Sequence, residues 1–264
     1  MRYLILDIEA VVDPSVWTPP EPPAEAGAID TPYPPRPDAF APVFAWRPIV
    51  IGLVLLRDAP AGVEVEKIGA VEENGGGEHE LLERFHQVVM KLGQVTIVTW
   101  NGRGYDLPVL LLRSLRYGFR APWYYAPRDT RYRYNETGHC DLMDAMGDYG
   151  AVRSLGLDGM ARLIGLPGKP QGADEVTGKN VGAAYAAGRL REITDYCIAD
   201  AVQTAFLWLR WQRLKGAGPA EATWYETSAK RLLEACDHDE RLTRLVTGVD
   251  RRVLLLEESG EAAA

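Results

Sequence analysis

Blocks of apolar residues alternate with polar segments along the chain, and their lengths and spacing predict the secondary structure. Residues 2–8 are mostly apolar and end at acidic residues, which predicts a buried central strand. Further apolar runs predict strands at 49–56, 63–71 and 95–100. Apolar residues at helical spacing predict helices at about 79–92, 108–118, 141–146, 155–164, 189–214, 220–235 and 238–247. Because strands come early and helices follow in alternation and then dominate, the pattern indicates an α/β fold with a mixed β-sheet flanked by helices.

The predicted elements divide the chain into a main domain over residues 1–215 and a C-terminal helical extension with a tail over residues 216–264. Residues 13–48 carry 11 of the 18 prolines, which predicts a long insertion loop because proline excludes the interior of both helix and sheet. The chain of 264 residues is long enough to bury a sizeable core. Apolar stripes in the extension predict that it packs on the main domain. The same stripes are also compatible with a contact between copies in a homo-oligomer.

Charge and cysteine content limit the class of protein. A net charge of −8 argues against a protein that coats nucleic acid by bulk charge, since such proteins are normally basic. The three cysteines are odd in number and far apart, so neither a disulfide framework nor a cysteine zinc site is expected. No apolar run approaches the roughly 20 residues that span a bilayer. We therefore expect a cytoplasmic protein with no membrane partner.

Acidic residues occur where the predicted elements end or begin. Asp7 and Glu9 come at the end of the first predicted strand and, as residues i and i+2, point to the same face. Asp106 follows a later buried strand, and Tyr196 and Asp200 share one face of the long late helix. Clustered carboxylates raise each other's pKa, so a fold that keeps them together needs a cation among them. Hard oxygen ligands favour Mg²⁺ or Mn²⁺.

Three segments together resemble the motifs of the DEDDy 3′–5′ exonucleases, a superfamily with the ribonuclease H-like fold. They are Asp7-Ile8-Glu9, Asn101-Gly102-Arg103-Gly104-Tyr105-Asp106 and Tyr196-Cys197-Ile198-Ala199-Asp200-Ala201. Over about residues 2–215 the chain most resembles the predicted 3′–5′ exonucleases related to the proofreading domain of family-B DNA polymerases. Ala10 stands where Thr is common, Tyr105 stands where Phe is more usual, and the stretch 171–179 is longer than is typical. The two substitutions remove no metal ligand.

The resemblance implies a hydrolase that cleaves phosphodiester bonds at the 3′ end of DNA or RNA, with single strands favoured. Two divalent ions, Mg²⁺ or Mn²⁺, would be held by Asp7, Glu9, Asp106 and Asp200, with Asp7 shared between them. Tyr196 would orient the attacking water, because a phenol with a pKa near 10 is a poor base at neutral pH. The competing hypothesis is a catalytically silent nucleic-acid-binding or docking module on the same fold, which the presence of all four acids disfavours.

Since no polymerase domain fits after residue 215, the resemblance implies a free-standing exonuclease or a partner subunit, and the sequence does not name a polymerase or repair partner. Five residues are candidate substrate contacts: Asn101, Arg103 and Tyr105 in the second motif, and Asp141 and Lys169 later in the chain. Asn101 is equally suited to cap a turn, and Asp141 to cap a helix. Three isolated histidines, His79, His86 and His238, are expected at the surface.

The distribution of charge changes what the overall acidity implies. Residues 101–133 carry seven arginines against two acids, a local charge of +5 directly after the second motif. Aromatic residues are interleaved with these arginines, as in grooves that bind single-stranded nucleic acid, although some of the rings must belong to the core. The arginines are Arg103, Arg113, Arg116, Arg120, Arg128, Arg131 and Arg133. The composition therefore allows an enzyme that holds one strand end locally.

Overall fold

A mixed five-stranded sheet forms the centre of the protein. The computed structural model describes residues 1–19, 41–152, 155–168, 175–216 and 222–257. The strands are β1 (Arg2–Val12), β2 (Trp46–Ala59), β3 (Gly62–Glu72), β4 (Thr96–Thr99) and β5 (His139–Asp141), and their spatial order is β3-β2-β1-β4-β5. The pairs β1–β2 and β2–β3 are antiparallel, whereas β1–β4 and β4–β5 are parallel. The expected mixed sheet is confirmed.

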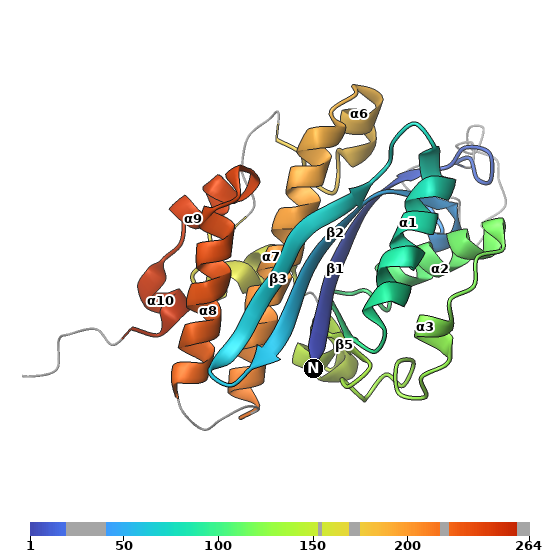
Figure 1. Cartoon of the computed structure of the whole chain (residues 1–264). Helices are drawn as coiled ribbons and strands as arrows, with labels where there is room; N and C mark the ends of the chain where they lie inside the picture. The colour runs from blue at the N-terminus through green and yellow to red at the C-terminus, as the bar shows by residue number, and fades with distance from the viewer. Residues whose placement is uncertain (20–40, 153–154, 169–174, 217–221, 258–264) are drawn as a thin grey trace, which may run out of the picture.

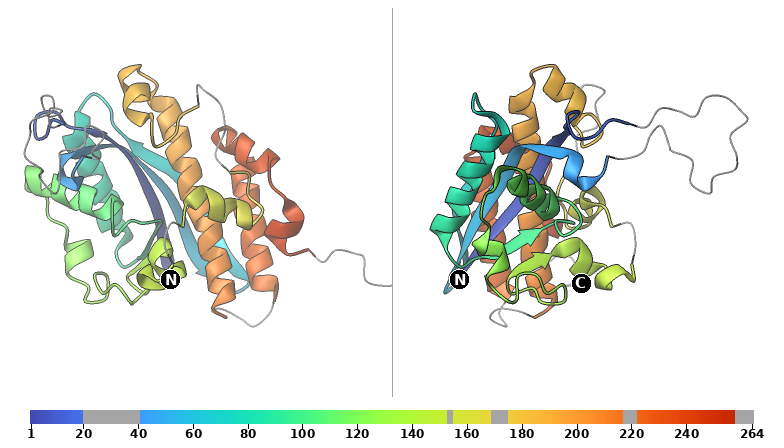
Figure 2. Two further views of the ribbon diagram at one scale, coloured as in Figure 1. Left: turned by 180° about the vertical axis from the view of Figure 1, so that it is seen from behind. Right: turned by 90° about the vertical axis from the view of Figure 1, so that its right-hand side faces the viewer.

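Helices cover both faces of this sheet (Figure 1). α7 (Leu190–Leu214) and α8 (Ala222–Asp237) pack on one face, and α1 (Gly77–Leu92) and α2 (Asp106–Tyr117) pack on the other. The shorter helical segments are η1 (Val43–Ala45), α3 (Pro122–Tyr125), α4 (Leu142–Met146), η2 (Asp148–Gly150), α5 (Leu157–Leu163), α6 (Val181–Ala186), η3 (Glu240–Leu242), α9 (Thr243–Thr247) and α10 (Arg251–Leu255). Behind the sheet, α5 packs against α7 (Figure 2).

β1 divides its side chains between the two helical layers. Leu4 and Leu6 belong to the apolar cluster with α1 and α2, whereas Ile5 belongs to the cluster with α7 and α8. Successive side chains of a strand point to opposite faces, so Asp7 and Glu9 follow Ile5 on the face covered by α7. The strand itself therefore directs both acids toward the long helix.

The prediction that Asp7 and Glu9 end the first strand is wrong, because β1 continues to Val12 with a register shift after Glu9. β2 supplies a pairing partner along the whole of this length. β4 does not: it pairs with β1 only over residues 3–5. The acids therefore lie beyond the end of β4 rather than beyond the end of β1, and side chains from the segment after β4 can reach that edge.

The C-terminal extension packs on the sheet, as its apolar stripes predicted. Val63 of β3 donates its amide hydrogen to the hydroxyl of Ser228 in α8 at 2.9 Å. Tyr225 of α8 donates to the carbonyl of Leu254 in α10 at 2.6 Å, and this bond holds the last helix against α8. The division at residue 215 stays a prediction, and residues 20–40 of the proline-rich segment lie outside the described part of the chain. None of the described helices combines the length and the apolar character that crossing a membrane requires.

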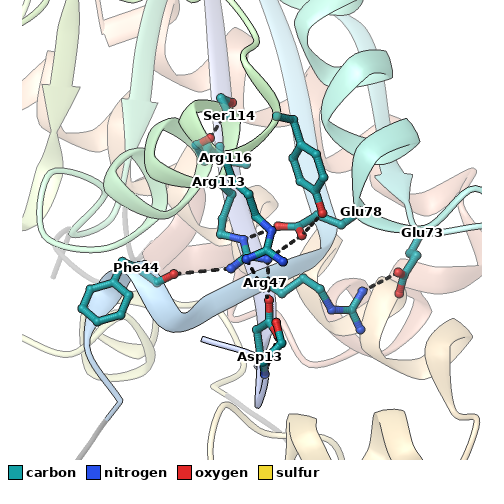
Figure 3. Close-up of polar contacts among 11 residues, drawn as sticks. Asp13, Phe44, Arg47, Glu73, Glu78, Arg113, Ser114 and Arg116 are labelled. Atoms are coloured by element: carbon teal, nitrogen blue, oxygen red, sulfur yellow. Dashed lines mark hydrogen bonds and ion pairs between the residues drawn. The ribbon is translucent and has the colours of Figure 1, made fainter. Parts of the chain in front are cut away.

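A buried ion-pair network joins α1 and α2 to the end of β1 (Figure 3). Arg113 donates to both carboxylate oxygens of Glu78, at 2.5 and 2.6 Å, and to Asp13 at 2.7 Å. Tyr117 donates to Glu78 at 2.8 Å. Only 2% of Arg113 is exposed, so this arginine balances two carboxylates inside the protein. Its inclusion in the basic surface predicted at 101–133 is wrong.

His86 is buried, which corrects its expected place at the surface; His79 and His238 are exposed as predicted. The indole nitrogen of Trp123 donates to Nδ1 of His86 at 3.0 Å, and Nε2 lies 2.8 Å from the hydroxyl oxygen of Ser114. Burial lowers the pKa of His86, so its ring is neutral. Leu82, Phe85 and Val89 lie on the same buried face of α1 as His86, and their helical spacing in the sequence is the signal that could have predicted its burial.

Candidate active site

Three carboxylates meet on the face of β1 that α7 covers. Single ligand oxygens of Asp7, Glu9 and Asp200 all lie within 4.8 Å of one another. Asp7 is half-buried, whereas Glu9 is 9% and Asp200 5% exposed. Carboxylate oxygens at this separation repel in the absence of a cation, and they are the ligands that Mg²⁺ and Mn²⁺ favour. The donor set and its spacing fit a divalent metal ion.

Asp106, the first residue of α2, comes to the same edge from the other side. The amide of Ile8, between Asp7 and Glu9, donates to its Oδ1 at 3.0 Å. Burial raises the pKa of Asp106 to about 7, with Asp141 and Asp200 adding to the rise and backbone hydrogen bonds opposing it. At neutral pH such a carboxyl group is only partly ionised, and a positive charge beside it would favour the anion. The structure thus brings all four predicted acids to one place, three as a tight cluster and the fourth on the amide between the first two.

The long helix approaches the sheet closely beside these acids. The amide of Gly52 in β2 donates to Sγ of Cys197 in α7 at 3.2 Å. The same sulfur lies 3.4 Å from the carbonyl oxygen of Asp7 and 3.6 Å from its Oδ2, both within reach of the thiol hydrogen. Cys197 therefore links the strand that carries Asp7 to the helix that carries Asp200. The sequence alone does not reveal this role, because the contact depends on how α7 crosses the sheet.

Tyr196 lies one helical turn before Asp200, on the same side of α7. Burial is the largest cause that raises its pKa above the ordinary value, and the charges of Asp200, Glu9 and Asp7 add to it. The phenol therefore stays protonated at neutral pH, and its hydroxyl can position a group but cannot act as a base. Tyr196 also lines a cavity of about 520 Å³ between α7 and the extension, which leaves room for a ligand beside it.

Asp141 shapes the turn that leads from β4 to Asp106. Its carboxylate accepts the amide hydrogens of Asn101 and Arg103, at 2.9 and 2.8 Å, and caps α4 through the amide of Asp144. Asn101 adopts a left-handed conformation with φ of 61°, which asparagine tolerates better than most residues. Asp141 therefore has the capping function that its sequence position allowed, whereas Asn101 shapes the turn through its backbone, whose carbonyl accepts the amides of Gly104 and Tyr105. Their role as substrate contacts stays a prediction.

The other candidate substrate contacts occupy different surroundings. One guanidinium nitrogen of Arg103 lies 3.2, 3.4 and 3.0 Å from the carbonyl oxygens of Thr130, Tyr132 and His139. Tyr105 packs edge-on against Trp46 with ring centroids 5.9 Å apart. Burial raises the pKa of Tyr105, with Glu9 the next cause, which places its ring at the border of the carboxylate cluster. Lys169 lies outside the described residues.

Fold and site together define the class of protein: a ribonuclease H-like α/β fold with four carboxylates at the edge beyond β4. The chain belongs to the family described as predicted 3′–5′ exonucleases related to the exonuclease domain of PolB, whose profile matches residues 38–246. The match includes Asp106, Tyr196 and Asp200 but begins after Asp7 and Glu9. It is the structure that adds those two acids to the site.

A solved structure has the same fold. The chain is similar to the family B DNA polymerase from the hyperthermophilic archaeon Pyrobaculum calidifontis, with a TM-score of 0.53 and 14% identity. The similarity covers 91% of this chain but only 29% of the polymerase. No curated protein matches the chain significantly. At this identity the likeness establishes the fold alone.

Proposed function

We propose that the protein is a metal-dependent 3′–5′ exonuclease that hydrolyses phosphodiester bonds at the 3′ ends of DNA or RNA. The observation that carries this proposal is the meeting of Asp7, Glu9 and Asp200 within 4.8 Å, with Asp106 bonded to the amide between the first two. Membership of the exonuclease family supports it. A silent binding module would have no use for four carboxylates held together against their repulsion.

The four acids divide into two groups that would hold two divalent cations. Glu9 and Asp200 would complete one site and Asp106 would serve the other, with Asp7 shared. When bound, such a pair acidifies the attacking water and stabilises the leaving 3′ oxygen. Tyr196 keeps its proton and orients the water through its hydroxyl. Asp141 bonds the turn that leads to Asp106 and so fixes its backbone. Asp106 is therefore already in position before substrate binds.

The experiment is the digestion of 5′-labelled oligonucleotides of DNA and RNA, single- and double-stranded, in Mg²⁺ or Mn²⁺. A ladder of shortened, still labelled products shows 3′–5′ direction, and EDTA is expected to stop it. The double variant Asp7→Ala, Asp200→Ala should be inactive. Undiminished digestion by this variant, or no digestion of any substrate by the parent, contradicts the proposal, and binding without cleavage would favour the silent module.

A cytoplasmic location is also proposed. Cys140, Cys197 and Cys236 are buried free thiols, and thiols of this kind persist in a reducing compartment. Fractionation of cells that express the tagged protein tests this location.

A further inference from the structure

Three tyrosines outside the carboxylate site form an aromatic row, of which two are exposed and the third is half-buried. Tyr132 and Tyr134 precede β5 and are each 60% exposed. The ring centroid of Tyr134 lies 5.9 Å from that of Tyr132 and 4.7 Å from that of Tyr149, which follows α4. Other aromatic residues of the region, such as Trp123, pack into the core beneath α1 and α2. The tyrosine row (Tyr132, Tyr134 and Tyr149) thus lies outside that core.

The backbone at one end of the row adopts a conformation that bulky residues avoid. Asp148 and Tyr149 have φ values of 47° and 53°, in the left-handed region. Two successive residues other than glycine in this region are unfavourable, so the surrounding structure must hold them there. The result is that the ring of Tyr149 contacts Tyr134.

Exposed arginines accompany the row. Four arginines and one acid occur within residues 120–134, and all four of these arginines are exposed. Arg133 makes a two-bond ion pair with Asp144, at 2.9 and 2.7 Å, and Arg131 lies over the ring of Tyr125 at 5.5 Å. The segment is therefore basic and aromatic in a protein whose net charge is −8. This combination attracts a polyanion with planar groups.

The row is connected to the turn that carries the fourth acid. The guanidinium of Arg103 reaches the carbonyl oxygen of Tyr132, and its amide donates to Asp141. Arg103 precedes Asp106 by only three residues. Arg103 therefore ties the segment that carries Tyr132 to the turn that carries Asp106.

We propose that the tyrosine row stacks the bases of a single-stranded nucleic acid whose 3′ end lies at the four carboxylates. The proposal rests on the proposed function. Every base has a π face, so stacking on tyrosine is tolerant of sequence, while nearby arginines attract the phosphates. Bases inside a duplex are already stacked on their neighbours and offer no such face. The row accordingly selects single strands over duplexes.

The test compares two double variants. The alanine pair carries Tyr132→Ala and Tyr134→Ala, and the phenylalanine pair carries Tyr132→Phe and Tyr134→Phe. Binding of a fluorescent single-stranded DNA or RNA of about 15 nucleotides is measured in EDTA, where cleavage is stopped. The alanine pair is expected to raise Kd on the order of 10-fold, and the phenylalanine pair to retain the Kd of the parent because it keeps the rings. Tyr125→Ala is the matched control, since Tyr125 is exposed but contacts Tyr124 and Arg131 instead of the row.

Kinetics separate this proposal from the proposed function. The alanine pair should raise KM for long single strands, while cleavage of a dinucleotide, which has no further bases to stack on the row, is unchanged. If the parent protein shows no cleavage and the alanine pair still weakens binding, the exonuclease assignment fails and the row stands. If the parent cleaves and the alanine pair binds as tightly as the parent, the row is overturned. An equal loss of binding by the phenylalanine pair also overturns it. So does a change in the oligomeric mass of the alanine pair without a change in its Kd.

Discussion

A Cβ atom on Gly52 would lie 2.6 Å from the carbonyl oxygen of Cys197, closer than real Cβ atoms approach other heavy atoms. Gly52 pairs directly with Asp7 across β1 and β2. The missing side chain therefore allows α7 to pack on the sheet beside the first acid, and this sets the depth at which Asp200 meets Asp7. Glycine at this position serves close packing, because its φ is not in the left-handed region.

Gly52→Ala is expected to push α7 away from β2. Forced overpacking of this kind costs roughly 1–3 kcal/mol of unfolding free energy, and the exonuclease rate should fall because the carboxylates separate. Denaturant unfolding and digestion assays measure the two effects. Gly69→Ala in β3 is the control, since a Cβ there would meet only the end of Lys67 at 3.7 Å. Normal activity in Gly52→Ala would show that the spacing does not matter.

Divalent cations are expected to stabilise the protein. At a concentration 100 times Kd, a bound ion adds about 2.7 kcal/mol, which corresponds to a rise in Tm of roughly 5–10 °C for a chain of this size. Asp200→Asn should show a smaller rise in Mg²⁺ and, in EDTA, a Tm at or above that of the parent because one repelling charge is gone. Glu83→Gln, an exposed acid on α1, is the control. Scanning calorimetry with and without Mg²⁺ makes the comparison, and an equal rise in Asp200→Asn contradicts the site.

Tyr196→Phe should slow hydrolysis by between about 10- and 100-fold, since the ring still packs but the hydroxyl that orients the water is lost. The Mg²⁺ concentration for half-maximal rate and the KM for substrate should stay close to those of the parent. Steady-state kinetics across a Mg²⁺ titration separates these quantities. A rate equal to that of the parent would refute the positioning role.

Arg113→Met leaves Glu78 and Asp13 buried without their cation. Removing one partner of a buried ion pair costs about 3–5 kcal/mol, so the midpoint of urea unfolding should fall sharply. Arg116→Met is the matched control: Arg116 is exposed and its nearest contact with Asp13 is 3.9 Å. A small effect in Arg113→Met would mean that water or another cation replaces the guanidinium.

Asp13 makes part of this stability depend on pH. Burial alone would raise its pKa, but hydrogen bonds from Ser15 and Arg113 outweigh burial and lower the pKa from 3.8 to about 2. Because the folded pKa is the lower one, the contribution of Asp13 is complete above pH 4 and disappears as the pH falls toward 2. It amounts to about 2 kcal/mol. The difference in unfolding free energy between the parent and Asp13→Asn should therefore shrink over that interval, and a difference that is constant with pH would exclude the linkage.

The sequence by itself determined the order of the elements and the identity of the acids. Asp7 and Glu9 share a face because a strand repeats every two residues, and Tyr196 and Asp200 share a face because a helix repeats every 3.6. The segments 49–56 and 63–71 were recognisable as strands for the same local reason. β5 and α6 were not, since each is short and its stability comes from neighbours rather than from its own pattern.

Only the tertiary structure decided which of these residues meet. Asp141 and Arg103 remain predicted substrate contacts, but the sequence did not show their structural bonds: Asp141 accepts the amides of the second-motif turn, and Arg103 donates to carbonyl oxygens in and before β5. Arg113 looked like part of a basic surface and lies in the core. Local periodicity specifies the side of an element on which a side chain lies, but contacts between distant elements depend on close packing, as where Gly52 admits α7. That packing is a property of the whole fold, and so the sequence named the four acids while the structure brought them together.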